Sequence, residues 1–465
     1  MSYRPIRELR SFGSQRWNKR RKGSQIHTSS RRQFLRHTAT LGLAATVAPR
    51  LCLSAAAKAD SKPNIILFMA DDVCYDNFSC YGSAYFKTPQ LDALAETGAK
   101  FNHCYSEPVC TPSRVKIMTG RDNIRNYIRF GILDKKEITF GTLLKEAGYA
   151  TAVSGKWQLH GGSREDGSLA PECGFDTYCL WNYPRTTRSR YWKPSLCRDG
   201  EILDSDEDDY GPDICTDFVI EFIKKNKDRP FFAYYPMLLG HSPFDPTPDS
   251  EDRNNKNKLE NYRDMVAYMD KCVGRIVDTL DKLGLREDTV ILFTTDNGTN
   301  RQLAYPYGDE TRQGEKAFPT DGGSHAPLIV NCPGVVPEGV VTDDLVDFSD
   351  FLPTLCEITC AKLPDVILDG RSFWPQCLGQ KGNPRQWIFQ YYYPKFKTAA
   401  DQYGEGKPYI IWAQNQEYKL YSHGKFIEVA DRYEKTNIPP GQGSRKAEDA
   451  RKLLRSALDS MPGSK

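Results

Sequence analysis

Two strand-length runs of the chain are almost entirely apolar, and each ends at an acidic residue. Residues 63–70 read Pro-Asn-Ile-Ile-Leu-Phe-Met-Ala and precede Asp71-Asp72, while residues 289–295 read Thr-Val-Ile-Leu-Phe-Thr-Thr and precede Asp296-Asn297. A strand without polar alternation cannot leave one face in water, so both runs predict central strands of a mainly parallel sheet covered by helices. Ligands of such sheets bind at the carboxyl ends of the strands, which is where these acids fall.

The chain around these runs alternates between helical and strand patterns, which favours one large α/β domain over residues 60–375. Thr88-Pro89 predicts a helix start, and an amphipathic pattern predicts a long helix over 259–283. The other expected elements are helices over 139–148 and 350–359 and strands over 149–154 and 230–236. We expect a large mixed, mainly parallel sheet sandwiched by helices.

The pattern changes after residue 375 to short aromatic runs. These runs cover residues 387–393, 409–412 and 417–421, and a charged helical pattern follows over 446–458. Short runs of this kind predict an antiparallel sheet. We expect a small C-terminal subdomain over residues 376–465, made of an antiparallel sheet and a helix.

The first 59 residues have the composition of a leader. They contain 13 Lys or Arg and one acid, Glu8, and the segment Ser30–Arg36 resembles a twin-arginine export signal. The apolar stretch Leu41–Ala48 is too short to span a bilayer, and small residues before Asp60 offer a cleavage site. We therefore expect export to the periplasm or the exterior, and no transmembrane helix in the mature chain. A basic arm that binds nucleic acid is the alternative.

Removing this leader reverses the sign of the net charge. The full chain is formally +3, but the remaining 50 bases and 59 acids give about −9. An acidic chain repels polyanions, so we expect no nucleic-acid partner, and an anionic substrate would need a local basic pocket. The chain has 14 cysteines; apart from Cys52 and Cys110 they are compatible with disulfides or with buried free thiols.

Cys110 opens a segment that reads Cys-Thr-Pro-Ser-Arg. Pro112 fits the first turn of a helix, which places Cys110 at the N-terminal end and Arg114 about one turn further on. Backbone N–H groups and the helix dipole favour an anion at that end. The residues alone leave two interpretations open, a reactive cysteine of low pKa or a buried cysteine at a helix start.

This segment, followed by Thr119-Gly120-Arg121, resembles the C-x-P-S-R and T-G-R signature of the type I sulfatases, members of the alkaline phosphatase superfamily. The resemblance extends over most of residues 63–360. It implies an alkaline-phosphatase-like fold and a formylglycine-generating enzyme that converts Cys110 to Cα-formylglycine, whose hydrate is the nucleophile. Arg114 would stabilise the ionised hydrate.

The acids at the two strand ends resemble the family's metal motifs. Asp71, Asp72, Asp296 and Asn297 are turn formers or helix caps when taken singly, but together they supply oxygen ligands suited to Ca²⁺, with Mg²⁺ as the alternative. The resemblance implies that these four residues bind the metal and that the modified Cys110 completes the set.

Residues 155–160 read Gly-Lys-Trp-Gln-Leu-His and resemble the family's G-K-W-H-L-G segment. Lys156 matches the lysine that holds a sulfate oxygen. Gln158 stands where the family has a histidine associated with sulfate release, and His160 follows two residues later. Three interpretations stay open: His160 substitutes, a metal-site carboxylate takes the proton, or turnover is slow.

Two further residues match the family pattern. His241 resembles the histidine that contacts the sulfate ester and protonates the leaving group, and Lys316 matches a lysine ahead of a G-G-x-x-x-P stretch. His325 is a second-rank candidate with an expected structural role.

We therefore expect a sulfuric ester hydrolase. A phosphatase, phosphodiesterase or phosphonate hydrolase of the same superfamily is the first alternative, and a catalytically degenerate secreted glycan-binding protein is the second. Residues 180–193 combine aromatic side chains with Arg185, Arg188 and Arg190, which could stack on sugar rings and bind sulfate or carboxylate groups. Ordinary packing explains them equally well. With export added, they suggest a sulfated oligosaccharide or polysaccharide substrate.

Overall fold

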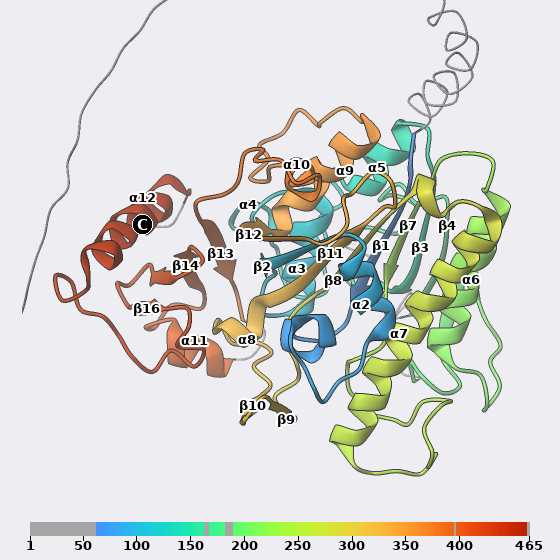
Figure 1. Cartoon of the computed structure of the whole chain (residues 1–465), viewed down its shortest axis with the longest axis horizontal. Coiled ribbons are helices and arrows are strands. Elements are labelled where there is room, and N and C mark those ends of the chain that lie inside the picture. Colours follow the sequence, from blue (N-terminus) through green and yellow to red (C-terminus); the bar gives the residue numbers. More distant parts are fainter. Residues whose placement is uncertain (1–61, 162–166, 182–188, 395–396, 463–465) are drawn as a thin grey trace, which may run out of the picture. The chain divides into compact units, whose positions relative to one another are not determined.

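The computed structural model describes residues 62–161, 167–181, 189–394 and 397–462, so the expected leader lies outside the described residues. A ten-stranded sheet runs through the main body (Figure 1), and its five central strands β8, β1, β7, β3 and β4 are all parallel. In sheet order the strands are β12 (Val340–Asp347), β2 (Ala99–Tyr105), β11 (His325–Asn331), β8 (Thr289–Thr295), β1 (Asn64–Ala70), β7 (Phe231–Pro236), β3 (Ala150–Lys156), β4 (Thr177–Trp181), β5 (Leu196–Arg198) and β6 (Glu201–Ile202). This confirms the expected mixed, mainly parallel sheet.

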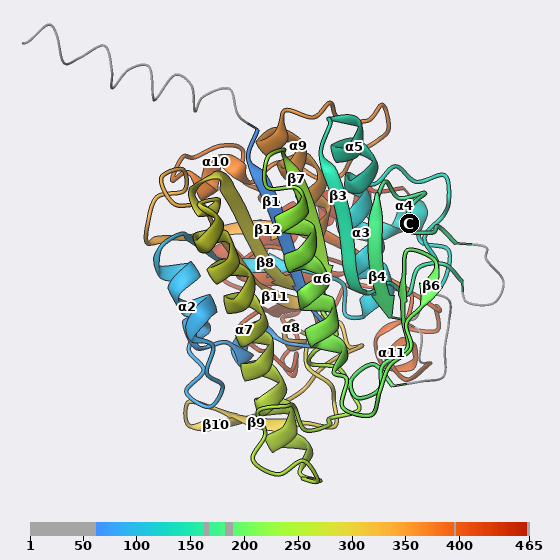
Figure 2. The ribbon, with the colours of Figure 1, turned by 90° about the vertical axis from the view of Figure 1, so that its right-hand side faces the viewer.

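Helices cover both faces of this sheet, as the apolar strands require. Ile65, Leu67 and Met69 of β1 belong to the core under one set of helices, whereas Ile66 and Phe68 belong to the core under the other. The first set is α3 (Cys110–Thr119), α5 (Phe140–Glu146) and α9 (Phe351–Thr359), and the second is α2 (Pro89–Glu96), α6 (Gly211–Lys225) and α7 (Lys258–Leu283). Figure 2 shows α6 and α7 lying side by side across the second face.

The C-terminal part of the chain forms an antiparallel sheet with one long helix, as expected. Its strands, in order, are β13 (Ile388–Tyr392), β14 (Ile410–Gln414), β15 (Tyr418–Tyr421) and β16 (Phe426–Glu428). Helix α12 (Arg445–Ser460) packs against one face through Leu454 and Leu458. The other face presents Trp412 and Tyr421 to a cluster that contains Cys110. The small sheet therefore forms part of the surroundings of Cys110.

The remaining elements are short. They are α4 (Asn123–Asn126), α8 (Asp321–Ser324), α10 (Trp374–Cys377), α11 (Lys397–Tyr403) and the hairpin of β9 (Ala304–Tyr307) and β10 (Glu310–Gln313). The thirteen cysteines of the described part are all free, in agreement with the thiol alternative.

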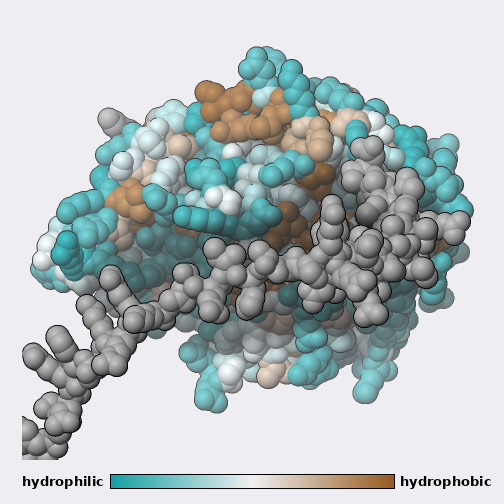
Figure 3. All heavy atoms as spheres, turned by 45° about the horizontal axis from the view of Figure 1, so that its top comes forward, coloured by the Kyte–Doolittle hydropathy of each residue, from teal (hydrophilic) through white to brown (hydrophobic). Residues whose placement is uncertain are grey.

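The described surface on the face shown in Figure 3 is largely hydrophilic, with apolar side chains gathered in patches. Exposed apolar side chains include Leu363, Val366 and Ile367 in the connection between α9 and α10. Among the described residues, no helix combines the length and hydropathy needed to cross a bilayer.

Candidate active site

The candidate site lies where four neighbouring parallel strands end. Strands β8 and β1 pair in register up to Ala70 and Thr295, so Asp71-Asp72 and Asp296-Asn297 emerge side by side. Lys156 is the last residue of β3, and His241 lies in the loop that follows β7. The sheet thereby brings together side chains that are far apart in the chain, such as Asp72 and Asn297 with a separation of 225 residues.

Glycine at position 155 allows Lys156 to reach this edge. Gly155 has a φ of +116°, and a Cβ there would lie 2.0 Å from the carbonyl oxygen of Pro236 on the neighbouring β7. A side chain would therefore force β3 and β7 apart at the point where the lysine enters the site. This is a physical reason for the Gly-Lys order in the Gly155–His160 segment.

Asp71 is fully buried between cations. One carboxylate oxygen accepts a hydrogen bond from Lys156 Nζ at 2.6 Å, and the other accepts one from Arg190 Nη1 at 2.6 Å. Burial raises the pKa of Asp71, but the charges of Lys156, Arg190 and Arg114 outweigh it and hold the pKa well below its usual range. Asp71 is therefore ionised at neutral pH.

Asp296 is paired with Arg114. Arg114 Nη2 and Nε donate to Asp296 Oδ2 at 2.7 and 3.2 Å, and Nη1 donates to the carbonyl oxygen of Lys156 at 3.1 Å. Burial and the nearby Asp71 raise the pKa of Asp296 to about 6 in spite of this arginine. Arg114 is buried behind the carboxylates and does not line the pocket described below.

Asp72 connects the other predicted residues. Lys316 Nζ donates to Asp72 Oδ2 at 2.5 Å, Asn297 Nδ2 donates to Asp72 Oδ1 at 2.9 Å, and His241 Nε2 lies 3.6 Å from Asp72 Oδ2. Asp72 itself has a φ of +63°, a left-handed conformation that aspartate tolerates better than most residues.

His241 is neutral in this setting. Burial, helped by the charges of Arg190 and Lys316, lowers its pKa to about 3. Its Nδ1–H donates to the carbonyl oxygen of Ser242 at 2.6 Å, so Nε2 is the nitrogen available to the site. In the neutral ring Nε2 is an acceptor, and it becomes a donor only when the ring is protonated.

The acidic residues fit a divalent cation. Ligand atoms of Asp71, Asp72 and His241 lie within 4.8 Å of one another. The Oδ1 atom of Asn297 is buried without a hydrogen-bond partner, although its Nδ2 is satisfied. An orphaned amide oxygen beside three carboxylates is the donor set of a hard cation such as Ca²⁺ or Mg²⁺.

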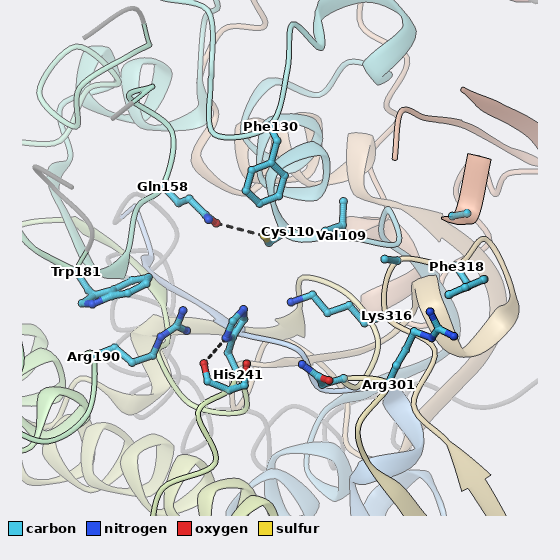
Figure 4. A pocket seen from close by; sticks show the side chains of 14 residues that line it. Val109, Cys110, Phe130, Gln158, Trp181, Arg190, His241, Arg301, Lys316 and Phe318 are labelled. Atoms are coloured by element: carbon cyan, nitrogen blue, oxygen red, sulfur yellow. Dashed lines mark hydrogen bonds between the residues drawn. The ribbon is translucent and has the colours of Figure 1, made fainter. Parts of the chain in front are cut away.

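Cys110 is the first residue of α3, and Val109 is the N-cap. Its side chain is almost fully buried, and Sγ donates to Gln158 Oε1 at 3.2 Å. Figure 4 shows Cys110 between Gln158 and Lys316, with the ring of His241 below them. The motif cysteine and the predicted lysine and histidine therefore face one pocket.

That pocket has a volume of about 520 Å³ and combines aromatic and cationic side chains. The lining includes Val109, Cys110, Phe130, Gln158, Trp181, Arg190, His241, Ser242, Asn300, Arg301, Lys316, Ala317, Phe318 and Ala399. Such a mixture suits a ligand with anionic groups on an apolar ring.

Gln158 and His160 differ in their relation to this pocket. Gln158 lines the pocket and has a φ of +59°. His160 is buried, pairs with Ile132 in a β-bridge, and is not one of the lining residues. Of the two, Gln158 is the residue that contacts Cys110.

Arg190 is more buried than expected for a substrate-binding residue on a surface loop. It is 5% exposed, bonds Asp71, and its guanidinium carbon lies 4.0 Å from the centroid of the Trp181 ring. Arg185 and Arg188 lie outside the described residues. His325 is away from the pocket, stacked on Tyr75 and Tyr105 with Nδ1 3.2 Å from Asp321, as expected of a structural histidine.

Sequence reasoning missed several lining residues. These residues are Phe130, Asn300, Arg301 and Phe318. Three of them had a signal in the sequence, because Asn300 and Arg301 closely follow Asp296-Asn297 and Phe318 closely follows Lys316, but Phe130 had none.

Comparisons with known proteins agree with this geometry. The sulfatase family profile matches residues 63–360. Arylsulfatase A of Homo sapiens is 31% identical over 385 residues, which cover 75% of this chain and 74% of the relative. The steryl-sulfatase of Rattus norvegicus is 26% identical over 442 residues, covering 75% and 76%.

Two solved structures share the fold. The crystal structure of Ps i-CgsB in complex with k-i-k-neocarrahexaose has a TM-score of 0.72 and 22% identity, covering 86% of this chain and 94% of that one. A protein solved in complex with its substrate D-glucosamine-2-N, 6-O-disulfate has a TM-score of 0.67 and 20% identity, covering 86% and 98%.

Proposed function

The chain belongs to the sulfatase family, and we propose that it removes sulfate from a sulfated carbohydrate by means of formylglycine at position 110 and a divalent metal ion. Sulfate ester hydrolysis itself follows from the family. The observation that carries the proposal is that Cys110, Lys316 and His241 face one pocket, with Asp71 and Asp72 bonded directly beneath it.

Charge neutralisation is the first requirement, because the oxygens of a sulfate ester repel a nucleophile. Lys316 and Arg190 present cations at the pocket wall, where Arg190 also bonds Asp71, and the buried Lys156 bonds the other oxygen of Asp71. The four oxygen-bearing residues Asp71, Asp72, Asp296 and Asn297 would hold Ca²⁺ or Mg²⁺, which when bound supplies a Lewis acid for the sulfate oxygens. The chain's own cations then orient the ester against Cys110.

Position 110 would supply the nucleophile. A formylglycine there, made by a maturation enzyme, would offer a hydrated aldehyde oxygen at the N-terminus of α3, where backbone N–H groups favour a developing anion. Gln158 Oε1 already accepts a hydrogen bond from the Cys110 side chain, so it can orient a hydroxyl group at the same position. Arg114 acts from behind, through Asp296.

His241 would donate a proton to the leaving oxygen of the ester. Its Nε2 faces the site, and its ring must be protonated to donate. An anionic ester next to the ring would favour the protonated form, which the free protein disfavours through burial.

A carbohydrate substrate is supported by the pocket and by the structural neighbours. Trp181, Phe130 and Phe318 provide aromatic faces for a sugar ring. One neighbour was solved with its substrate D-glucosamine-2-N, 6-O-disulfate and another with k-i-k-neocarrahexaose. The twin-arginine-like Ser30–Arg36 segment supports export to the periplasm or the exterior.

The test has two parts. Mass spectrometry of the Cys110 peptide should show conversion of the thiol to the aldehyde when the chain is produced with a formylglycine-generating enzyme. The converted protein should release sulfate from sulfated oligosaccharides, and Cys110→Ser should not. Hydrolysis of phosphate or phosphonate esters in preference to sulfate esters would instead favour the superfamily alternative, and no hydrolysis by a fully converted protein would favour the glycan-binding alternative.

A further inference from the structure

Arg301 stands at the wall of the pocket without an internal counter-charge. Its guanidinium carbon lies 4.0 Å from the centroid of the Phe318 ring, and the side chain is exposed. Among the described residues, no carboxylate pairs with it and no acceptor bonds its guanidinium. The other lining cations differ, because Arg190 is bonded to Asp71 and Lys316 to Asp72.

The backbone that carries Arg301 is firmly held. Gly298 N donates to the Gly323 carbonyl at 2.9 Å, and a Cβ at Gly298 would lie 1.8 Å from the carbonyl oxygen of Gly322. Lys316 N donates to the Thr299 carbonyl at 3.0 Å. Gln313 Nε2 donates to the carbonyl oxygen of Arg301 itself at 2.6 Å. This loop also carries Asp296, so Arg301 has a fixed separation from the sulfate site.

Asn300 adds a neutral donor beside the arginine. Its Oδ1 accepts a hydrogen bond from Gln302 N at 3.0 Å, whereas its Nδ2 has no acceptor among the described residues. Both Asn300 and Arg301 line the pocket, and Figure 4 shows Arg301 on the side opposite Trp181 and Arg190. The pocket therefore has a second group of donors, on the side opposite Trp181 and Arg190 (Figure 4).

We propose that Arg301 and Asn300 bind a second anionic group of the substrate, a sulfate or a carboxylate on the sugar that carries the scissile sulfate or on its neighbour. The proposal rests on the proposed function for the position of the scissile sulfate. A guanidinium fork and an amide N–H match the oxygens of either anion, and stacking on Phe318 orients the fork before binding. A neutral sugar would leave this cation without a partner.

The positive charge of Arg301 favours an anionic group over a carbohydrate hydroxyl as its ligand. The chain from Asp60 onward is acidic, at about −9, yet no acidic residue lines this pocket within the described part. The cations at Asp71 and Asp72 each already bond a carboxylate, so Arg301 is the lining cation that a second anion would pair with.

Binding can be measured without turnover in the Ca²⁺-loaded chain with Cys110→Ser. Three probes share a 6-O-sulfate: N-acetylglucosamine 6-sulfate has no second anion, D-glucosamine-2-N, 6-O-disulfate has a second sulfate, and an unsaturated uronyl disaccharide of N-acetylglucosamine 6-sulfate has a carboxylate. Titration calorimetry in this background would compare Arg301→Ala, Arg301→Lys and a matched control, Arg253→Ala. Arg253 is also exposed and stacked on an aromatic ring, 3.6 Å from the Trp192 centroid, but lies outside the pocket.

We expect at least one two-anion probe to bind about tenfold more tightly than the one-anion probe, the effect of one charge-assisted contact. Arg301→Ala should reduce that ratio to about twofold or less, Arg301→Lys should retain part of it, and Arg253→Ala should leave it unchanged. The probe that shows the advantage identifies sulfate or carboxylate. A ratio near one, a ratio that survives Arg301→Ala, or no binding of either two-anion probe would overturn the inference. Absence of sulfate ester hydrolysis by the converted wild-type chain would instead count against the proposed function. The ratio of the binding constants would still decide whether Arg301 and Asn300 bind a second anion.

Discussion

Replacing Lys116 by methionine should destabilise the helix that carries Cys110. Lys116 lies on α3, is completely buried, and has no route to solvent for its charge. Its Nζ lies 2.8 Å from Asp347 Oδ2, 3.0 Å from Asp122 Oδ1 and 3.5 Å from Glu107 Oε1, and donates to Phe389 O at 3.0 Å and to Gln390 Oε1 at 3.2 Å. The lysine thus joins α3 to β12 and to β13 of the C-terminal sheet.

Methionine keeps most of the side-chain volume of Lys116, so the loss of stability comes from removing the positive charge. Removing one partner of a buried ion pair costs about 3–5 kcal/mol, because the remaining charges stay buried without compensation. For a folded unit of roughly 400 residues, an unfolding entropy near 2.1 cal/mol/K per residue converts that cost to a Tm lower by about 4–6 °C.

The effect should depend on pH. Burial, only partly offset by Lys116, raises the pKa of Glu107 to about 8 and that of Asp122 to about 7. A carboxyl whose folded pKa exceeds its ordinary value near 4.5 binds more protons when folded, so stability falls as pH rises from about 4.5 to about 8. Without Lys116 these pKa values rise further and the fall becomes steeper. The Tm difference from wild type should therefore grow between pH 5.5 and pH 8.5.

Scanning fluorimetry and circular dichroism at several pH values would measure this. Lys116→Met combined with Asp347→Asn should recover part of the loss, because one uncompensated carboxylate is removed. Lys271→Met is a matched control, since Lys271 pairs with Asp249 at 2.7 Å on the surface and such pairs contribute about 1 kcal/mol or less. A Lys116→Met Tm within about 1 °C of wild type at pH 8.5, or a difference that shrinks as pH rises, would refute the reasoning.

Three other predictions concern the site. Chelation should abolish sulfate ester hydrolysis and lower the Tm by about 3–5 °C, with both restored by Ca²⁺ or Mg²⁺; full activity in a verifiably metal-free sample would contradict the metal assignment. Gln158→His should change the slow, sulfate-releasing phase of burst kinetics by about tenfold or more and the first sulfur–oxygen cleavage less; two unchanged phases would show that another residue already has that role. Arg190→Ala should impair hydrolysis of a small aryl sulfate and of a sulfated oligosaccharide alike, because Arg190 bonds Asp71, whereas Arg185→Ala with Arg188→Ala should impair the oligosaccharide selectively; equal effects of the double variant on both substrates, or none, would remove that segment from substrate recognition.

The parts of the fold that the sequence predicts are those with a strong local pattern. Strands β1 and β8 are buried on both faces, and α7 buries one face along its 26 residues, so each leaves a clear pattern. Strand β12 was not predicted, because Asp343 and Asp344 interrupt it where its pairing with β2 shifts register. An edge strand can expose such residues, and only the assembled sheet shows that it is an edge.

The site residues also divide into those that a local sequence pattern predicts and those that only tertiary packing places. Asp71 and Asp296 were predictable because a polar residue directly after a buried parallel strand lies at the carboxyl edge of the sheet, where ligands bind. Arg190 was expected as a substrate-binding residue, but its bond to Asp71 depends on tertiary packing of a loop, and no spacing from a strand end indicates it. Phe130 also lies on a loop, and nothing in the sequence singles it out. The side chain of Gln158 reaches Cys110 from a left-handed backbone conformation, so the sequence position alone could not separate it from His160.

The charge balance of the site bears on how a metal ion and a sulfate ester would bind together. Three buried carboxylates, Asp71, Asp72 and Asp296, are matched by four cations, which are Arg114, Lys156, Arg190 and Lys316. With His241 neutral, the group has a formal charge of +1, so mutual repulsion between the acids does not require a metal. The orphaned oxygen of Asn297 remains the feature that a cation would satisfy. A divalent ion would raise the local charge to +3, and that excess positive charge favours the sulfate ester over a neutral ligand. Metal and substrate should therefore bind with positive coupling, each more tightly in the presence of the other.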